Sequence, residues 1–173
     1  HSFANSDQFR VGHLDLDLRA DFIARSLVGS VELSVTRLVP QARVLVLDTR
    51  NLDVRAVFLV QDDRAVPLEA ALGVASAPLG QPLQIRLPDG HVANEFALRI
   101  EYATRPDASG LQWLEPRMTA GRKHPFLFSQ SQVIHARSWI PLQDTPAIRT
   151  TYEARIRTPR ELLAVMSARN DVN

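Results

Sequence analysis

Apolar and polar residues alternate along several stretches of the chain, as expected of β-strands with one buried face. The clearest stretch is 14–22, where leucine, alanine and phenylalanine alternate with aspartate and arginine. The same alternation recurs at 26–36, 83–87, 96–102 and 148–156. Because successive side chains of a strand point to opposite faces, each stretch predicts a half-buried strand.

Turn-forming residues between these stretches predict two hairpins. The first hairpin turns around Ala24 to Leu27, and the second joins strands at 54–60 and 65–68 through Gln61-Asp62-Asp63-Arg64. A short apolar run, Val44-Leu45-Val46-Leu47, predicts a strand buried on both faces.

The remaining segments show weaker patterns. We expect a loose lead-in at 1–10, a loop at 70–80 and an irregular stretch at 103–126, whereas 161–166 fits either a strand or a short helix. No segment shows a sustained helical period. The sequence therefore predicts an all-β fold of several packed, mainly antiparallel sheets, in one domain over residues 1–173.

Composition narrows the classes of partner. The 173 residues hold 20 Lys and Arg against 19 Asp and Glu, so the net charge of +1 gives no reason to expect a nucleic acid or an anionic membrane. There is no cysteine, and no apolar run is long enough for a membrane span. No signal peptide is visible, but the chain starts at His1, so the compartment stays open between cytoplasm and periplasm or secretion.

The unusual chemistry gathers at 128–146, FSQSQVIHARSWIPLQDTP. Gln130 and Gln132 lie two apart, which predicts that a strand places both on one face, with Ser131 on the other. Side-chain amides neither titrate at neutral pH nor act as nucleophiles, but they donate and accept hydrogen bonds. The pair is therefore suited to binding a carbonyl, an ammonium or a hydroxyl group. The alternative is an ordinary strand and turn with satisfied polar groups.

Candidate catalytic and metal-binding groups are poorly supported. The five histidines lack metal-ligand spacing, and there is no HExxH motif, so we expect no zinc site in this chain. Ser129 or Ser131 can be combined with His135 and Asp144 into a Ser-His-Asp catalytic triad. The sequence offers no nucleophile elbow or oxyanion hole to support it. We expect His135 to be buried as structural support, holding the turn at Asp144.

Paired and clustered charges have solvated interpretations. We expect Asp15 with Asp17, and Asp62 with Asp63, to lie on a solvent face and in a turn. Arg149, Arg155 and Arg157 share one strand face, and this stripe indicates a solvated surface or a domain interface.

Several motifs in a fixed order resemble those of a known family. They are Ser109-Gly110-Leu111-Gln112-Trp113-Leu114, His124-Pro125-Phe126-Leu127-Phe128-Ser129-Gln130, Gln143-Asp144-Thr145-Pro146 and Glu161-Leu162-Leu163-Ala164-Val165-Met166-Ser167-Ala168. Together with Gln132 and His135, they resemble the N-terminal domain of the zinc aminopeptidases that include leukotriene hydrolase and aminopeptidase N. The leukotriene-hydrolase branch is more similar, and the likeness is collinear from His13 onward.

The resemblance implies a saddle-shaped β domain packed beside a catalytic domain of the same, longer polypeptide. It implies a parent enzyme that releases N-terminal amino acids from peptides, with zinc held by the catalytic domain outside this chain. Gln130 and Gln132 would lie at the lip of the active site, where Gln132 reads the free α-amino group of the peptide. The aminopeptidase N branch commonly has glutamate at that position. This chain alone, without HExxH or GxMEN, is expected to be inactive.

Two other functions stay open on the residues alone. One is a free-standing β-sandwich binding module for protein or carbohydrate, although aromatic residues make up only 6% of the chain. The other is a purely structural interaction domain. The residues leave undetermined the preferred substrate side chain, any epoxide hydrolase activity and the oligomeric state.

Overall fold

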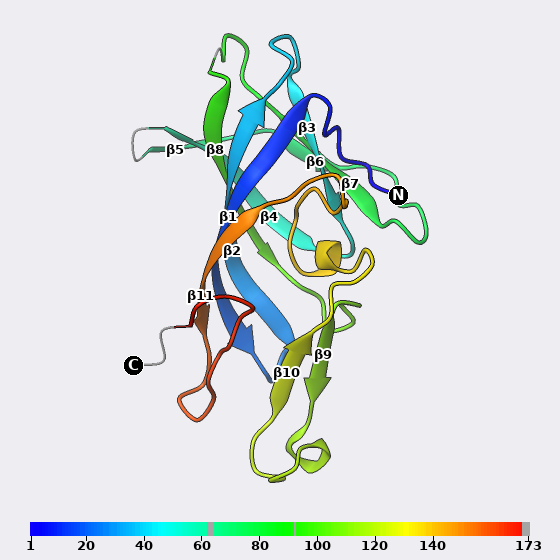
Figure 1. Cartoon of the computed structure of the whole chain (residues 1–173), viewed down its shortest axis with the longest axis vertical. Helices are drawn as coiled ribbons and strands as arrows, with labels where there is room; N and C mark the ends of the chain where they lie inside the picture. Colours follow the sequence, from blue (N-terminus) through cyan, green and yellow to red (C-terminus); the bar gives the residue numbers. More distant parts are fainter. Residues whose placement is uncertain (62–63, 92, 171–173) are drawn as a thin grey trace.

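A computed structural model describes residues 1–61, 64–91 and 93–170 (Figure 1). Within these residues the regular structure consists of strands and two short 3-10 helices. In chain order the elements are β1 (Phe9–Asp21), β2 (Ser26–Arg37), β3 (Val44–Thr49), β4 (Asp53–Gln61), β5 (Arg64–Pro67), β6 (Ala70–Leu72), β7 (Gln81–Arg86), β8 (Glu95–Ala103), β9 (Leu111–Leu114), η1 (Pro116–Met118), β10 (Phe126–Ser129), η2 (Ala136–Ser138) and β11 (Thr151–Arg157).

The strands form three sheets. The largest has the order β11-β1-β2-β8-β4-β5, the second has the order β3-β7-β6, and β9 pairs with β10. Every pairing is antiparallel except that of β11 with β1, which is parallel and places the last strand beside the first (Figure 1). The β9–β10 hairpin projects from one end of the molecule.

The core lies between the two larger sheets. Leu14, Leu16 and Leu18 of β1 are buried while their neighbours are exposed or half-buried, so the large sheet buries one face. Leu45 of β3 and Ile85 of β7 are also fully buried and belong to the same hydrophobic cluster. The structure is thus a sandwich whose inner faces come from the alternating apolar residues.

The all-β fold expected from the sequence is confirmed. The first hairpin turns at 22–25, β4 pairs with β5 as predicted, and Leu98 and Ile100 of β8 are fully buried. Asp62 and Asp63 of the second turn lie outside the described residues. The run at Val44 to Leu47 is only half-buried at alternate positions, because β3 faces the core on one side.

Four weaker predictions are wrong. The first eight residues are hydrogen-bonded rather than loose, as Asn5 bonds to β3 at Val44 and Val46. The stretch at 70–80, expected to be a loop, contains β6, and the stretch at 103–126, expected to be irregular, contains β9. Residues 161–166, expected to be a strand or a short helix, form neither, whereas the strand expected at 148–156 is present as β11 and only begins later, at Thr151. These short elements carry too few inward positions for a clear period.

Candidate functional site

The loop after β10 carries both glutamines, and it is not a strand. Strand β10 ends at Ser129, which pairs with Leu111, the first residue of β9. Beyond that pair one further backbone bond joins the Gln130 amide to the Gly110 carbonyl. The chain then turns, and the His135 amide donates to the Ser131 carbonyl over 2.9 Å. The predicted strand through Gln130 and Gln132 is therefore wrong. Both residues instead lie on one exposed turn, which we call the glutamine loop (residues 130–135).

The two glutamines are both exposed but differ in what they offer. The Gln132 backbone amide donates to Oε1 of Gln130 over 3.2 Å, so this oxygen is already engaged. The Nε2 amino group of Gln130 remains available as a donor. Among the described residues, the side-chain amide of Gln132 has no hydrogen-bond partner, so its oxygen and its nitrogen both face solvent.

Ser131 anchors the loop to the core. Its hydroxyl accepts a hydrogen bond of 3.1 Å from Nε1 of Trp139, a side chain that is 8% exposed. The strand that placed Ser131 opposite the glutamines is wrong, but Ser131 does differ from them in direction: its hydroxyl faces buried Trp139, whereas Gln130 and Gln132 are exposed.

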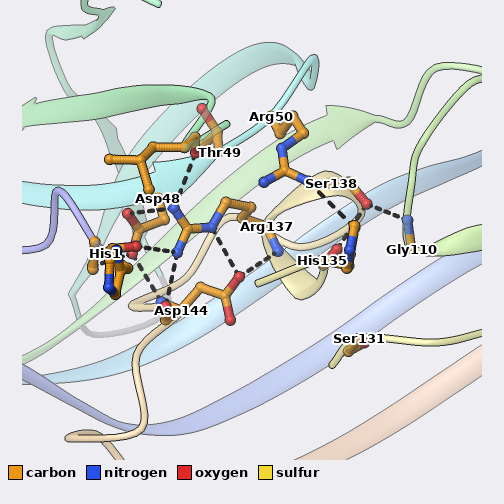
Figure 2. Close-up of polar contacts among 12 residues, drawn as sticks. His1, Asp48, Thr49, Arg50, Gly110, Ser131, His135, Arg137, Ser138 and Asp144 are labelled. Atoms are coloured by element: carbon orange, nitrogen blue, oxygen red, sulfur yellow. Dashed lines mark hydrogen bonds and ion pairs between the residues drawn. The ribbon is translucent and has the colours of Figure 1, made fainter. Parts of the chain in front are cut away.

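His135 closes the other end of the loop (Figure 2). Its Nδ1 lies 2.8 Å from Oγ of Ser109 and 3.3 Å from Nη1 of Arg50. The ring is half-buried rather than buried, and it braces the loop against Ser109 and not against Asp144. Burial, followed by repulsion from Arg137, lowers the pKa of Arg50 below its usual value.

Arg137 is the residue that holds Asp144 (Figure 2). Its side chain is fully buried, and Nε donates to the Asp144 carboxylate over 2.9 Å. Nη1 lies 3.3 Å from the carboxylate of Asp48 and 3.0 Å from the Leu79 carbonyl. Nη2 donates to the carbonyls of His1 and Asp144.

Asp48 completes this buried ion pair. Its carboxylate accepts hydrogen bonds from the Ser2 hydroxyl at 2.5 Å, the Phe3 amide at 2.7 Å and the Asp144 amide at 2.9 Å. A buried ion pair is stable only when further hydrogen bonds offset the desolvation of both charges. The Arg137–Asp48 pair meets that condition and ties the N-terminus, β3 and the segment after η2 together.

Sequence reasoning missed this pair. The available signal was a charged residue directly after the apolar run of β3, and another within the largely apolar segment around Trp139. Charged residues in such settings are buried only when paired. The sequence does not say that these two residues meet.

The Ser-His-Asp triad considered from the sequence is not assembled in the structure. Ser131 contacts Trp139, His135 contacts Ser109 and Arg50, and Asp144 contacts Arg137. Arg155 and Arg157 of the arginine stripe are exposed in this chain and pair with half-buried Asp17, whereas Arg149 lies before β11. The choice between a solvated surface and a domain interface stays a prediction. Over residues 1–61, 64–91 and 93–170, no three His, Cys, Asp or Glu side chains gather closely enough to hold a metal ion. No helix in that part of the chain has the length and apolarity to cross a bilayer.

The fold and the glutamine loop identify the chain as an all-β domain that presents side-chain amides at its surface. Its described residues contain no cluster of metal-binding side chains. The chain belongs to the family described as the Peptidase M1 N-terminal domain, whose model matches residues 11–172.

Two curated relatives illustrate the match. Leukotriene A-4 hydrolase of Xenopus laevis is 40% identical over 171 residues, which are 98% of this chain and 27% of the relative. Leucine aminopeptidase 2 of Chaetomium globosum is 36% identical over 166 residues, 95% of this chain and 26% of the relative. The chain thus spans about a quarter of the length of these relatives.

Solved structures agree. The structure of yeast LTA4 hydrolase in complex with bestatin matches with a TM-score of 0.82 and 34% identity, over 91% of this chain and 24% of that one. An M1 zinc metallopeptidase from Deinococcus radiodurans matches with a TM-score of 0.62 and 21% identity, over 94% of this chain and 37% of that one. The second likeness shows the fold alone.

Proposed function

We propose that this chain is the N-terminal substrate-binding and structural domain of a zinc aminopeptidase that releases N-terminal amino acids from peptides. In this proposal the glutamine loop faces the catalytic domain of the same polypeptide, and Gln132 reads the free α-amino group of the peptide. Family membership and the names of the relatives support the activity. The observation that carries the site is the exposed side-chain amide of Gln132, which has no partner within residues 1–61, 64–91 and 93–170.

The amide chemistry suits this role. An ammonium group offers three donors and no acceptor, so it binds amide oxygens. No described residue donates to the side-chain oxygen of Gln132, whereas the oxygen of Gln130 already accepts one hydrogen bond from the loop backbone. We therefore assign the ammonium to Gln132, and to Gln130 a donor role toward a backbone carbonyl of the peptide.

Zinc belongs to the proposal only through the parent enzyme. The described residues offer no ligand set that fits a metal. No catalytic step is therefore assigned to zinc on this chain, and the proposed zinc lies in the catalytic domain. In keeping with this, we expect the isolated chain to hydrolyse no aminoacyl substrate.

The test is Gln132→Ala in the full-length enzyme. Losing one hydrogen bond to a charged ammonium costs about 1.5–3 kcal/mol, which corresponds to a kcat/KM roughly 10- to 150-fold lower. Steady-state kinetics on an aminoacyl p-nitroanilide measure it. Gln132→Glu should be milder, since a carboxylate also accepts from the ammonium.

A matched control is Gln84→Ala, which removes an exposed glutamine side chain from β7 in the other sheet. It should leave kcat/KM unchanged. The proposal fails if Gln132→Ala behaves like Gln84→Ala while both variants stay folded.

The alternative of a free-standing carbohydrate-binding module gains no support from the tryptophans. Such modules use exposed aromatic rings, whereas Trp139 is buried and Trp113 is half-buried against Phe22.

A further inference from the structure

Ser131 lies between the two glutamines and is held on both its backbone and its side chain. Its carbonyl accepts from the His135 amide at 2.9 Å, which closes the turn. Its hydroxyl accepts from Nε1 of Trp139 at 3.1 Å. Trp139 belongs to the hydrophobic core cluster, so this hydrogen bond connects the exposed loop to the rigid interior of the domain.

A second brace fixes the two ends of the loop to one point, Gly110, and Figure 2 shows its His135 end, which runs through Ser138. The Gly110 carbonyl accepts from the Gln130 amide at 2.9 Å, and its amide donates to the Ser138 hydroxyl at 2.8 Å. That hydroxyl donates in turn to the His135 carbonyl at 2.7 Å. A Cβ on Gly110 would lie 2.6 Å from the His135 carbonyl oxygen, so only glycine allows this approach.

With both ends fixed at Gly110, the middle of the loop depends on Ser131. The described residues show no other side-chain hydrogen bond from the core to residues 130–132. Removing the Ser131 hydroxyl would therefore remove the side-chain anchor between the two glutamines and leave the Gln130 amide bonded to Gly110.

We infer that Ser131 is a positioning residue, which uses its hydrogen bond from Trp139 to hold Gln130 and Gln132 in the geometry that recognises a peptide N-terminus. This inference rests on the proposed function of the glutamine loop. Neutral amides attract nothing at a distance, so their contribution to binding depends on hydrogen-bond geometry. A loop that loses its central anchor samples other arrangements, and the substrate must then bear the entropy of ordering it.

The kinetic test uses the full-length enzyme and an aminoacyl p-nitroanilide. Ser131→Ala should lower kcat/KM about 3- to 10-fold, the effect of one neutral hydrogen bond, and mainly by raising KM. Ser131→Thr keeps the hydroxyl and should stay within about twofold of the wild type. Ser34→Ala removes an exposed hydroxyl from β2 and is the matched control without effect.

A spectroscopic readout reports the hydrogen bond itself. The chain has two tryptophans, so Trp113→Phe leaves Trp139 as the only one in this domain. The measurement uses the full-length enzyme. The difference between the emission spectra of the Trp113→Phe enzyme with and without Ser131→Ala isolates the change at Trp139. Ser131→Ala should shift the emission of Trp139, and Ser131→Thr should restore it.

The outcomes separate the two proposals. If Gln132→Ala raises KM but Ser131→Ala does not, the positioning role is overturned and the proposed function stands. An emission shift without a kinetic effect also overturns it, because the contact then exists without serving the substrate. If Gln132→Ala leaves kcat/KM unchanged, the proposed function fails and this inference fails with it.

Discussion

A single arginine holds together segments that are distant in the sequence. Arg137 is fully buried and contacts Asp48, Asp144 and the carbonyls of His1 and Leu79. Its planar guanidinium supplies five donors in a fixed arrangement, which a lysine ammonium cannot reproduce. Arg137 therefore matters more for stability than any exposed arginine of the chain.

We predict that Arg137→Ala lowers the free energy of unfolding by about 3–5 kcal/mol, because it leaves the buried Asp48 carboxylate without a counter-charge. Urea denaturation measures the change. Arg149→Ala, which truncates an exposed side chain, is the control and should stay within about 0.5 kcal/mol of the wild type. An equal loss in both variants would contradict the assignment of Arg137 to a buried pair.

Among the elements, the N-terminal segment serves as an edge cover for β3. The Asn5 side chain donates to the Val44 carbonyl and accepts from the Val46 amide, as a neighbouring strand would. Ser2 and Phe3 donate to the Asp48 carboxylate. Open strand edges pair with other chains, and this segment protects the edge of the smaller sheet.

Deleting residues 1–5 should lower the free energy of unfolding by about 2–5 kcal/mol, since two hydrogen bonds to a buried charge are lost. Chemical denaturation of the truncated chain checks this value. Asn5→Ala keeps the bonds to Asp48 and should cost less than the deletion. A truncated chain as stable as the full one would show that water replaces the segment without cost.

The alternation of apolar and polar residues predicted well those strands that bury one face, such as β1 and β8. The glutamine loop was misassigned because two glutamines at i and i+2 fit a strand equally well. Strand β10 ends at Ser129, one backbone bond before the chain turns, and the point where pairing stops is not encoded in the local pattern. The Arg137–Asp48 pair was missed for the same reason.

At the scale of the whole molecule, one end of the large sheet brings buried Arg37, at the end of β2, against His91 in the loop before β8. His91 packs edge-on against Phe96 with ring centroids 5.0 Å apart, and its carbonyl accepts from buried Arg37. Burial, with repulsion from Arg37 and Arg43, lowers the pKa of His91 below its usual 6.5. This end of the sandwich therefore favours the neutral imidazole.

The sign of the pH dependence follows from that shift. Because the folded pKa lies below the unfolded one, the unfolded chain binds the proton more readily as the pH falls below about 6.5. Between pH 7.5 and 5.5 the wild type should thus lose more unfolding free energy than His91→Gln, as measured by urea denaturation. Exposed His124→Gln is the control and should follow the wild type. Equal losses for all three would rule out His91 as the source.

The parallel pairing of β1 with β11 also has a consequence for how the chain is made. His13 and Thr151 are partners 138 positions apart, and a ribosome takes roughly 7 to 28 seconds to add that many residues. During that time the outer edge of β1 has no partner and is open to strands of other nascent chains. Asp15, Asp17 and Arg19 line the solvent face of this strand, and such charges discourage wrong pairing at an open edge. The alternation that encodes the strand thus also protects the chain during its synthesis.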